Sequence, residues 1–411
     1  MSMKQTIAHP LFGNACRVAG GALLAASLAA PATAADDFTT ALVGGKASAD
    51  LRLRYEGVEQ DNALKDADAT TVRVRLGYQT GEFLGFSAFL EAEHLTALGS
   101  EGYNSTVNGK TAYSVVADPE FTEINQAFLS YSGLPETALK YGRQRLVLDN
   151  HRFIGNVGWR QNEQTFDAFT VVNRSLPDTT ITAGYINNVN RVFSDDSPVG
   201  DFRMSSPIFN VKYEGLRAGT LVGYGYLLDF DDLPASSTRT FGVRFTGSAP
   251  FAGDMKALYT AEYASQSDYA DNPGNFDLDY YLVEGGIDAG RLTAKLGYEV
   301  LGSDDGVAFQ TPLATLHAMN GWADQFLVTP AAGLKDAYVS AGTAVAGVKV
   351  EAIFHDFRAD KGDARYGTEW DLVATKAFGK HYSVGAKYAA YQAKDFSVDT
   401  DKFWLWGEAR F

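Results

Sequence analysis

The residues best suited to do chemistry in this sequence are arginines at alternating positions. Arg52 and Arg54 stand two residues apart, and so do Arg73 and Arg75. In an extended chain such a spacing puts both side chains of a pair on one face. Guanidinium groups stay charged and bind carboxylates through two hydrogen bonds. If the two segments are neighbouring strands, they form one cationic patch suited to anions, and Arg244 shows the same alternation later in the chain.

A second set of candidates lies between residues 141 and 167, where arginines are interleaved with aromatic and amide residues. The charged members are Arg143, Arg145, Arg152, Arg160 and Asp149, and the others are Asn156 and Trp159. A second long segment around Trp322 is similarly rich in aromatic residues. We expect both segments to fold inward and constrict a pore. The alternative is that they pack on a rim with their charges paired.

The sequence shows no pattern typical of a catalytic, metal-binding or cofactor-binding site. The six histidines are scattered, and neither a G-x-S-x-G nor an H-E-x-x-H motif is present, so no catalytic residue is assigned. Cys16 is the single cysteine, which excludes disulfide, zinc-thiolate and iron–sulfur sites. The acidic run 229–232 lacks the ligand order of an EF-hand. We therefore expect no cofactor and no metal.

The elements that position these residues have a period of two. Apolar and polar residues alternate in segments of roughly 8–12 residues, as in membrane-spanning strands. About eighteen such segments follow one another, and short connections alternate with long ones. Short turns on one side and long loops on the other are typical of outer-membrane barrels. The sequence therefore predicts an all-β, antiparallel, up-and-down transmembrane barrel, wide enough for an aqueous lumen.

The two ends of the chain support export to a membrane. Residues 1–34 show a charged start, an apolar stretch and an A-x-A site, which predicts a cleaved signal peptide. We expect residues 35–411 to form a single barrel domain with long extracellular loops and no plug domain. Phe411 ends an alternating strand, which resembles the signal read by the barrel assembly machinery. The net charge of −15 argues against nucleic acid as a partner.

Two segments resemble the alginate export family: residues 141–167 and residues 311–327 with their continuation to 336. The resemblance implies a monomeric porin in the lipid bilayer of the Gram-negative outer membrane, with arginines in the lumen and loops that constrict it. We expect passive diffusion of hydrophilic anions, either small anions or an anionic polysaccharide such as alginate. The alternatives are a general diffusion porin without anion specificity and, more remotely, a barrel hydrolase.

Overall fold

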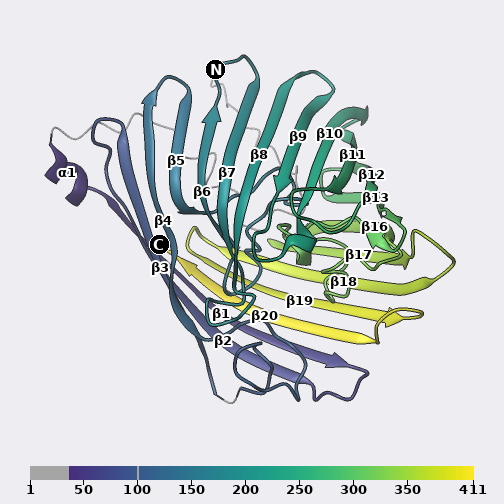
Figure 1. The fold of residues 1–411 in the computed structure, drawn as a ribbon. Coiled ribbons are helices and arrows are strands. Elements are labelled where there is room, and N and C mark those ends of the chain that lie inside the picture. The colour runs from purple at the N-terminus through teal and green to yellow at the C-terminus, as the bar shows by residue number, and fades with distance from the viewer. Residues whose placement is uncertain (1–36, 100) are drawn as a thin grey trace, which may run out of the picture.

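A computed structural model describes residues 37–99 and 101–411 of the chain; the predicted signal peptide lies outside them. Over the described residues, eighteen antiparallel strands form one sheet, and Figure 1 shows them curling into a barrel. The strands are β1 (Lys46–Gln60), β2 (Ala67–Gln79), β3 (Phe86–Ala97), β4 (Phe121–Leu134), β5 (Thr137–Gln144), β6 (Thr165–Asn173), β7 (Thr179–Asn190), β8 (Asp201–Leu216), β9 (Gly219–Leu228), β10 (Thr238–Ala252), β11 (Met255–Asp268), β12 (Asp277–Asp288), β13 (Leu292–Leu301), β16 (Leu334–Val345), β17 (Val348–Arg358), β18 (Arg365–Phe378), β19 (Tyr382–Ala393) and β20 (Thr400–Arg410).

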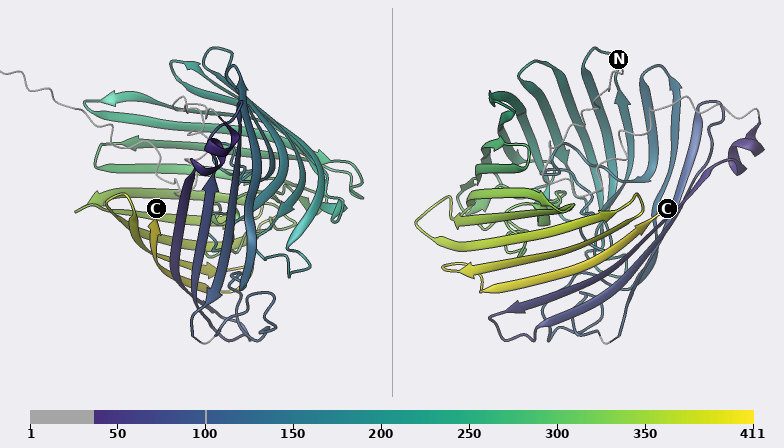
Figure 2. Two further views of the ribbon diagram at one scale, coloured as in Figure 1. Left: turned by 90° about the vertical axis from the view of Figure 1, so that its left-hand side faces the viewer. Right: turned by 180° about the vertical axis from the view of Figure 1, so that it is seen from behind.

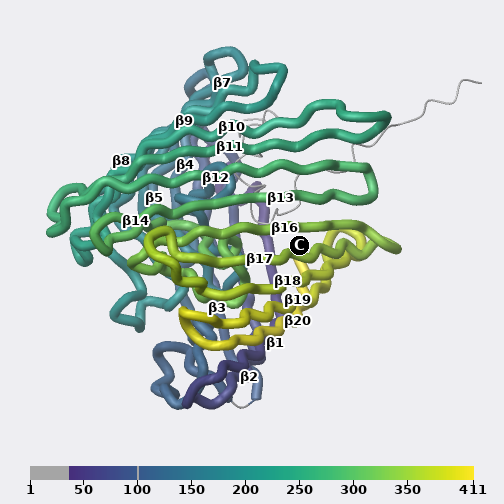
Figure 3. Tube along the Cα trace, turned by 90° about the vertical axis from the view of Figure 1, so that its right-hand side faces the viewer, coloured from purple at the N-terminus to yellow at the C-terminus, as the bar shows by residue number. Residues whose placement is uncertain are grey.

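The sheet closes because its first strand pairs on both sides. β1 pairs with β2 along one edge and with the last strand, β20, along the other. The other strands each pair with their neighbours in sequence, as the successive tubes of Figure 3 show. Closure gives every strand a partner on both sides, which a sheet surrounded by lipid requires. The predicted eighteen-stranded barrel is confirmed.

The barrel wall carries apolar residues on its outer face and charged residues on its inner face, the reverse of the arrangement in a soluble protein. On β2, Leu76 is 60% exposed on the outer face, whereas the neighbouring Arg75 points inward and is 6% exposed. The same alternation repeats along other strands, for example Val283 outside and Leu282 inside on β12. The outer face therefore matches lipid, and charged side chains are gathered inside.

Connections differ in length at the two ends of the barrel. Tight turns join β4 to β5, β8 to β9 and β16 to β17, whereas residues 98–120, 145–164 and 302–333 form long connections at the opposite end. The alternation of short and long connections predicted from the sequence is thus present. The last long connection includes the small hairpin of β14 (Ser303–Asp304) and β15 (Val307–Ala308) and the 3-10 turn η3 (Leu316–Ala318).

Helical structure is minor. A short helix, α1 (Phe38–Val43), precedes β1 and was not expected from the sequence; Figure 2 shows it beside the barrel wall. A second 3-10 turn, η2 (Pro234–Ser236), lies between β9 and β10. Within the described part of the chain, no helix has the length and apolar character to cross a membrane.

Candidate functional site

Two long connections fold into the barrel instead of extending from it. We call residues 145–164, between β5 and β6, the first inner loop, and residues 302–333, between β13 and β16, the second inner loop. Arg152, Asn156 and Trp322 are almost completely buried within the ring of strands. The apolar side chains of both loops pack against inward-facing residues of the wall in one hydrophobic cluster. The candidate site is therefore formed by these two loops and the wall that holds them.

The two inner loops are joined to each other by backbone and side-chain bonds. The N–H of Gly155 donates to the carbonyl of Leu313 at 2.9 Å, and the N–H of Thr315 donates to the carbonyl of His151 at 3.0 Å. Arg152 donates to Asn320 at 3.1 Å and pairs with Glu299 of β13 at 3.0 Å. The loops therefore form one unit.

The arginines of β1 and β2 hold the first inner loop by its backbone carbonyls. Arg52 lies opposite Arg73 in the strand register, so the two rows meet as the sequence predicts. Arg52 donates to the carbonyls of residues 158, 159 and 160 at 3.2 Å each, and Arg54 donates to that of Trp159 at 2.7 Å. Arg73 and Arg75 both donate to the carbonyl of Gln161, at 3.4 and 3.3 Å.

The same arginines are also paired with carboxylates. Arg52 binds Glu408 at 2.6 Å, and Arg73 binds Asp50 at 2.5 Å. The remaining partners are Asp118 and Glu56 for Arg54, and Glu93 and Glu163 for Arg75. Removing one member of such a buried pair is costly, because it leaves an uncompensated charge. The cationic rows are thus structural anchors of the first inner loop.

Glu163 connects the wall to the end of the first inner loop. It binds Arg145 at 2.5 Å and Arg75 at 3.1 Å. Asn125 and Asn156 donate to it at 2.6 and 2.7 Å. Burial by itself raises the pKa of Glu163, but the guanidiniums of Arg145 and Arg75 outweigh burial and hold the pKa well below its ordinary range. Glu163 was not among the residues predicted to form the site, although its position in an arginine-rich stretch is a usable signal.

The second inner loop is held by carboxylates on β18. Ala323 donates its N–H to Glu369 at 2.6 Å, and Trp322 donates its N–H to Asp371 at 3.2 Å. The turn before them has positive φ at both Asn320 and Gly321. Successive N–H groups in such a turn converge on one side and bind anions. Neither carboxylate was among the residues predicted to form the constriction.

Trp159 and Trp322, both predicted for the constriction, meet around Lys387 of β19. The Lys387 ammonium lies 4.3 Å from the Trp159 ring and 3.7 Å from the Trp322 ring, and it contacts Nε2 of His317 at 2.8 Å. His317 stacks on Trp159 with ring centroids 4.9 Å apart. Because an ammonium only donates, Nε2 of His317 accepts and Nδ1–H donates to Asp324 at 2.7 Å. Burial and the Lys387 charge lower the pKa of His317 to about 3.

Arg160 and Asp149 complete the predicted loop residues. Arg160 binds Glu56 of β1 and Asp324 of the second inner loop, each at 3.1 Å. Asp149 lies at the opposite wall, where Asn210 of β8 donates to it at 2.6 Å. Burial raises the pKa of Asp149. Arg244 of β10 also faces inward and pairs with Glu262.

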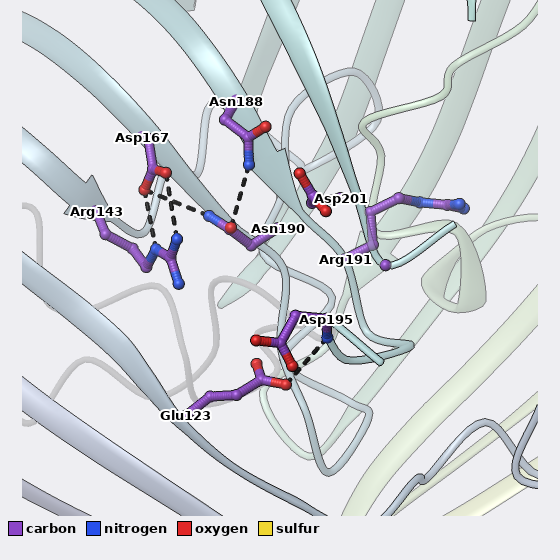
Figure 4. Close-up of a pocket in the computed structure, with 9 residues that line it drawn as sticks. Glu123, Arg143, Asp167, Asn188, Asn190, Arg191, Asp195 and Asp201 are labelled. Carbon is purple, nitrogen blue, oxygen red and sulfur yellow. Dashed lines mark hydrogen bonds and ion pairs between the residues drawn. The ribbon is translucent and has the colours of Figure 1, made fainter. Parts of the chain in front are cut away.

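Arg143 requires a correction, because the structure places it outside the lumen. It lies two residues beyond Tyr141, which is 66% exposed on the outer face, and next to the inward-facing, buried Gln144. Its Nε and Nη2 atoms donate to the two carboxylate oxygens of Asp167 on β6, at 2.9 and 3.2 Å, and Figure 4 shows this pair. Arg145 lies beyond the end of β5, where the alternation no longer applies, and its guanidinium pairs with Glu91 and Glu163 inside the barrel, whereas Arg143 still belongs to the strand.

No group of three His, Cys, Asp or Glu side chains within residues 37–99 and 101–411 is placed to hold a metal ion.

Comparison with known proteins identifies both a family and a fold. The family model described as alginate export matches residues 46–270, more than half of the chain. No curated protein matches the chain. Among solved structures, OccAB4 of Acinetobacter baumannii is similar with a TM-score of 0.70 at 16% identity, covering 89% of this chain and 98% of that one. OpdK of Pseudomonas aeruginosa, solved with vanillate, gives the same four values. At such identities these structures show a shared fold.

Proposed function

The chain belongs to the alginate export family, and from this premise we propose that its outer-membrane channel conducts hydrophilic anions by passive diffusion. The observation that carries the proposal is the meeting of two arginine rows, Arg52 with Arg54 and Arg73 with Arg75, on the lumen side of adjacent strands. Rings or ladders of basic side chains favour anions in a pore. Arg145 and Arg244 add cationic groups to the same interior and are less deeply buried.

The solutes proposed are carboxylates, from small acids to the uronate units of a polysaccharide such as alginate. Guanidinium groups match carboxylates in shape and charge. OpdK was solved with vanillate, an aromatic carboxylate, which supports a carboxylate as the first solute to test. We further propose that the barrel functions as a monomer, and that its assembly depends on the strand ending at Phe411. Phe411 is 58% exposed and its backbone pairs with that of Ala49.

A channel without charge preference is the second candidate, because a specific observation favours it. Each of the four strand arginines has a carboxylate partner within the lumen. The charges of an arginine and its carboxylate partner largely cancel at a distance. The electrostatic field on a passing ion therefore depends on how evenly positive and negative side chains are distributed around the lumen. The two candidates differ in the sign and the size of the reversal potential.

Planar-bilayer recordings under a salt gradient distinguish the candidates. For the anion channel we expect a reversal potential of anion sign that is largest at low salt, since the Debye length is about 30 Å at 0.01 M and about 10 Å at 0.1 M. Arg244→Gln should shift the reversal potential toward cations, because it leaves Glu262 uncompensated. Asp196→Asn, in the β7–β8 connection, is the matched control and should leave it in place. A wild-type channel that prefers cations or shows no preference contradicts the anion proposal.

A further inference from the structure

A polar cavity of about 430 Å³ lies at the long-loop end of the barrel, apart from the two inner loops. Its lining comes from β4, from β5 to β8 and from the β7–β8 connection, as Figure 4 shows. Cavities of this size accommodate small molecules. Neither the constriction nor its anchors use the residues that line this cavity.

The cavity exists because β5 ends earlier than β4. The pairing of these strands stops at Ala127 opposite Arg143, while β4 continues to Phe121 along β3. Polar groups fill the gap beside this free edge. Arg143 donates to the carbonyl of Ile124 at 3.2 Å, and the N–H of Asp195 donates to Glu123 at 3.1 Å. The cavity is therefore a recess in the barrel wall itself.

The recess lies at the level of the lipid headgroups. Tyr141, Phe169 and Tyr185 form an exposed row on the outer face of β5, β6 and β7. Aromatic rows of this kind mark the membrane interfaces of barrels. The next outward positions on β5 and β6 toward the long loops are Arg143 and Asp167, and Asp167 lies opposite Asn188 of β7. Because the long loops are extracellular in such barrels, the recess faces the outer leaflet.

The lining offers both donors and acceptors in a connected arrangement. Asn188 donates to Asn190 at 3.1 Å, and Asn190 donates to Asp167 at 3.4 Å. The lining holds four carboxylates, and of its two guanidiniums only that of Arg143 is turned toward them, as Figure 4 shows. The guanidinium of Arg191 lies over Phe193 and Phe202 instead, so the lining is net negative. Hydroxyl groups both donate and accept and so suit this mixture, whereas phosphates and uronates are repelled by the excess of carboxylates.

We propose that this recess binds a neutral or amine-bearing sugar ring. The ring belongs either to the headgroup of a glycolipid in the outer leaflet or to a free saccharide in the medium. In both cases the amides and carboxylates bind the hydroxyls, and an amine adds charge complementarity. This site is separate from the proposed path of anions. Its ligands are uncharged or positively charged, whereas the solutes proposed for the channel are negatively charged.

The test compares two neighbouring asparagines. Asn188→Leu removes an amide from the recess, and Asn187→Leu changes an exposed residue of the same strand that does not line the cavity. Titration calorimetry on the purified barrel in detergent uses glucosamine, methyl glucoside and glucuronate as probes. We expect glucosamine or methyl glucoside to bind more tightly than glucuronate. Asn188→Leu should weaken that binding at least tenfold, and Asn187→Leu should leave it unchanged.

A second arm identifies the source of the sugar and keeps the test decisive. The same variants are reconstituted in nanodiscs that contain a monoglucosyl diacylglycerol, whose headgroup is an uncharged sugar, and the retained glycolipid is quantified by mass spectrometry. Loss of retention in Asn188→Leu alone supports a lipid headgroup, and calorimetric binding of the free sugars supports a soluble saccharide. The proposal is overturned if the two variants behave alike in both arms, or if glucuronate is the tightest ligand. Heat-modifiable migration on gels verifies that each variant is folded.

Discussion

The two inner loops are held in place by opposite chemistry. The first inner loop presents backbone carbonyls between residues 158 and 161, and the wall meets them with guanidiniums from β1 and β2. The second inner loop presents the backbone amides of Trp322 and Ala323, and the wall meets them with carboxylates from β18. In both cases a charged side chain on a strand of the wall binds a backbone group of a loop.

The difference follows from local backbone shape. Asn320 and Gly321 both have positive φ, so the amides after them converge on one side, and only an anion fits there. The segment 158–161 turns its carbonyls to the wall, so donors with several N–H groups fit best, which favours arginine. The sign of the wall charge is therefore matched to the loop that lies against it. Substitutions that weaken one anchor and leave the other intact therefore test whether each wall charge holds its own loop.

The largest effect is expected at the arginine anchor. Arg54→Leu removes a side chain that is 1% exposed and leaves the buried Asp118 without its guanidinium. Breaking a buried pair of this kind costs about 3–5 kcal/mol. The free energy of unfolding in urea, followed by tryptophan fluorescence, should fall by that amount, and the first inner loop should become sensitive to protease.

The matched control for this change is a surface pair at the rim. Arg203→Leu breaks the contact of Arg203 with Asp232, in which the arginine side chain is 70% exposed. Exposed pairs contribute about 0–1 kcal/mol. Equal losses in Arg54→Leu and Arg203→Leu would contradict the anchoring role.

The carboxylate anchor should give a smaller effect confined to the second inner loop. Glu369→Leu deprives the N–H of Ala323 of its acceptor, and hydrogen bonds to charged groups are worth about 1.5–3 kcal/mol. A cysteine introduced by Gln325→Cys reports loop release through its rate of maleimide labelling, since Cys16 of the predicted leader is the only natural cysteine. We expect faster labelling in Glu369→Leu. Glu214→Leu, at an exposed position near the end of β8, serves as the control and should label at the original rate.

Acid should loosen the junction of the two loops in two steps. His317 has a pKa of about 3 in the folded protein, below its ordinary 6.5, so a released loop binds a proton that the closed one does not. By linkage, the stability of the closed arrangement falls as the pH drops below about 6.5. The pKa of Asp324 is held low by Lys402, His317 and Arg160 against the effect of burial, and its contribution is lost only as the pH falls through the ordinary carboxylate range.

Replacing the histidine separates these steps. His317→Gln keeps an oxygen to accept from Lys387 but cannot take up a proton. The labelling rate at Gln325→Cys is divided at each pH by that of glutathione, because only the thiolate reacts and its fraction falls with pH. This ratio should rise between pH 7 and pH 5 in the protein with His317 and stay flat in His317→Gln. If both proteins respond alike over this range, His317 does not control the junction.

The strands of the barrel wall could be predicted from the sequence, whereas most of the contacts that hold the two inner loops could not. Lipid requires an apolar outward residue at every second position, so all eighteen strands and the alternation of their connections were predicted, and Phe411 was placed on the outward face. Glu56 stands two residues from Arg54 on the same face of one strand, so this partner follows from the alternation. Asp118 and Asp324 were not predictable, because only the folding of the long loops brings them to Arg54 and Arg160. Arg143 was assigned to the lumen because of the arginine-rich stretch around it, and this assignment is wrong. Strand alternation would have placed it correctly, because Arg143 lies two residues from the outward-facing Tyr141.

The smallest effect is expected at Arg143, and its comparison with Arg145 tests the assignment of faces. Arg145 binds Glu91 and Glu163 inside the barrel, so Arg145→Gln leaves two lumen carboxylates short of a cation and should move the reversal potential toward cations. Arg143→Gln breaks a half-exposed pair on the outer face, which costs about 0–1 kcal/mol and leaves the lumen charge as it was. Its reversal potential should therefore equal that of the unmodified channel at both low and high salt. A shift in Arg143→Gln as large as that in Arg145→Gln would place both arginines along the path of the ions and refute the outward assignment.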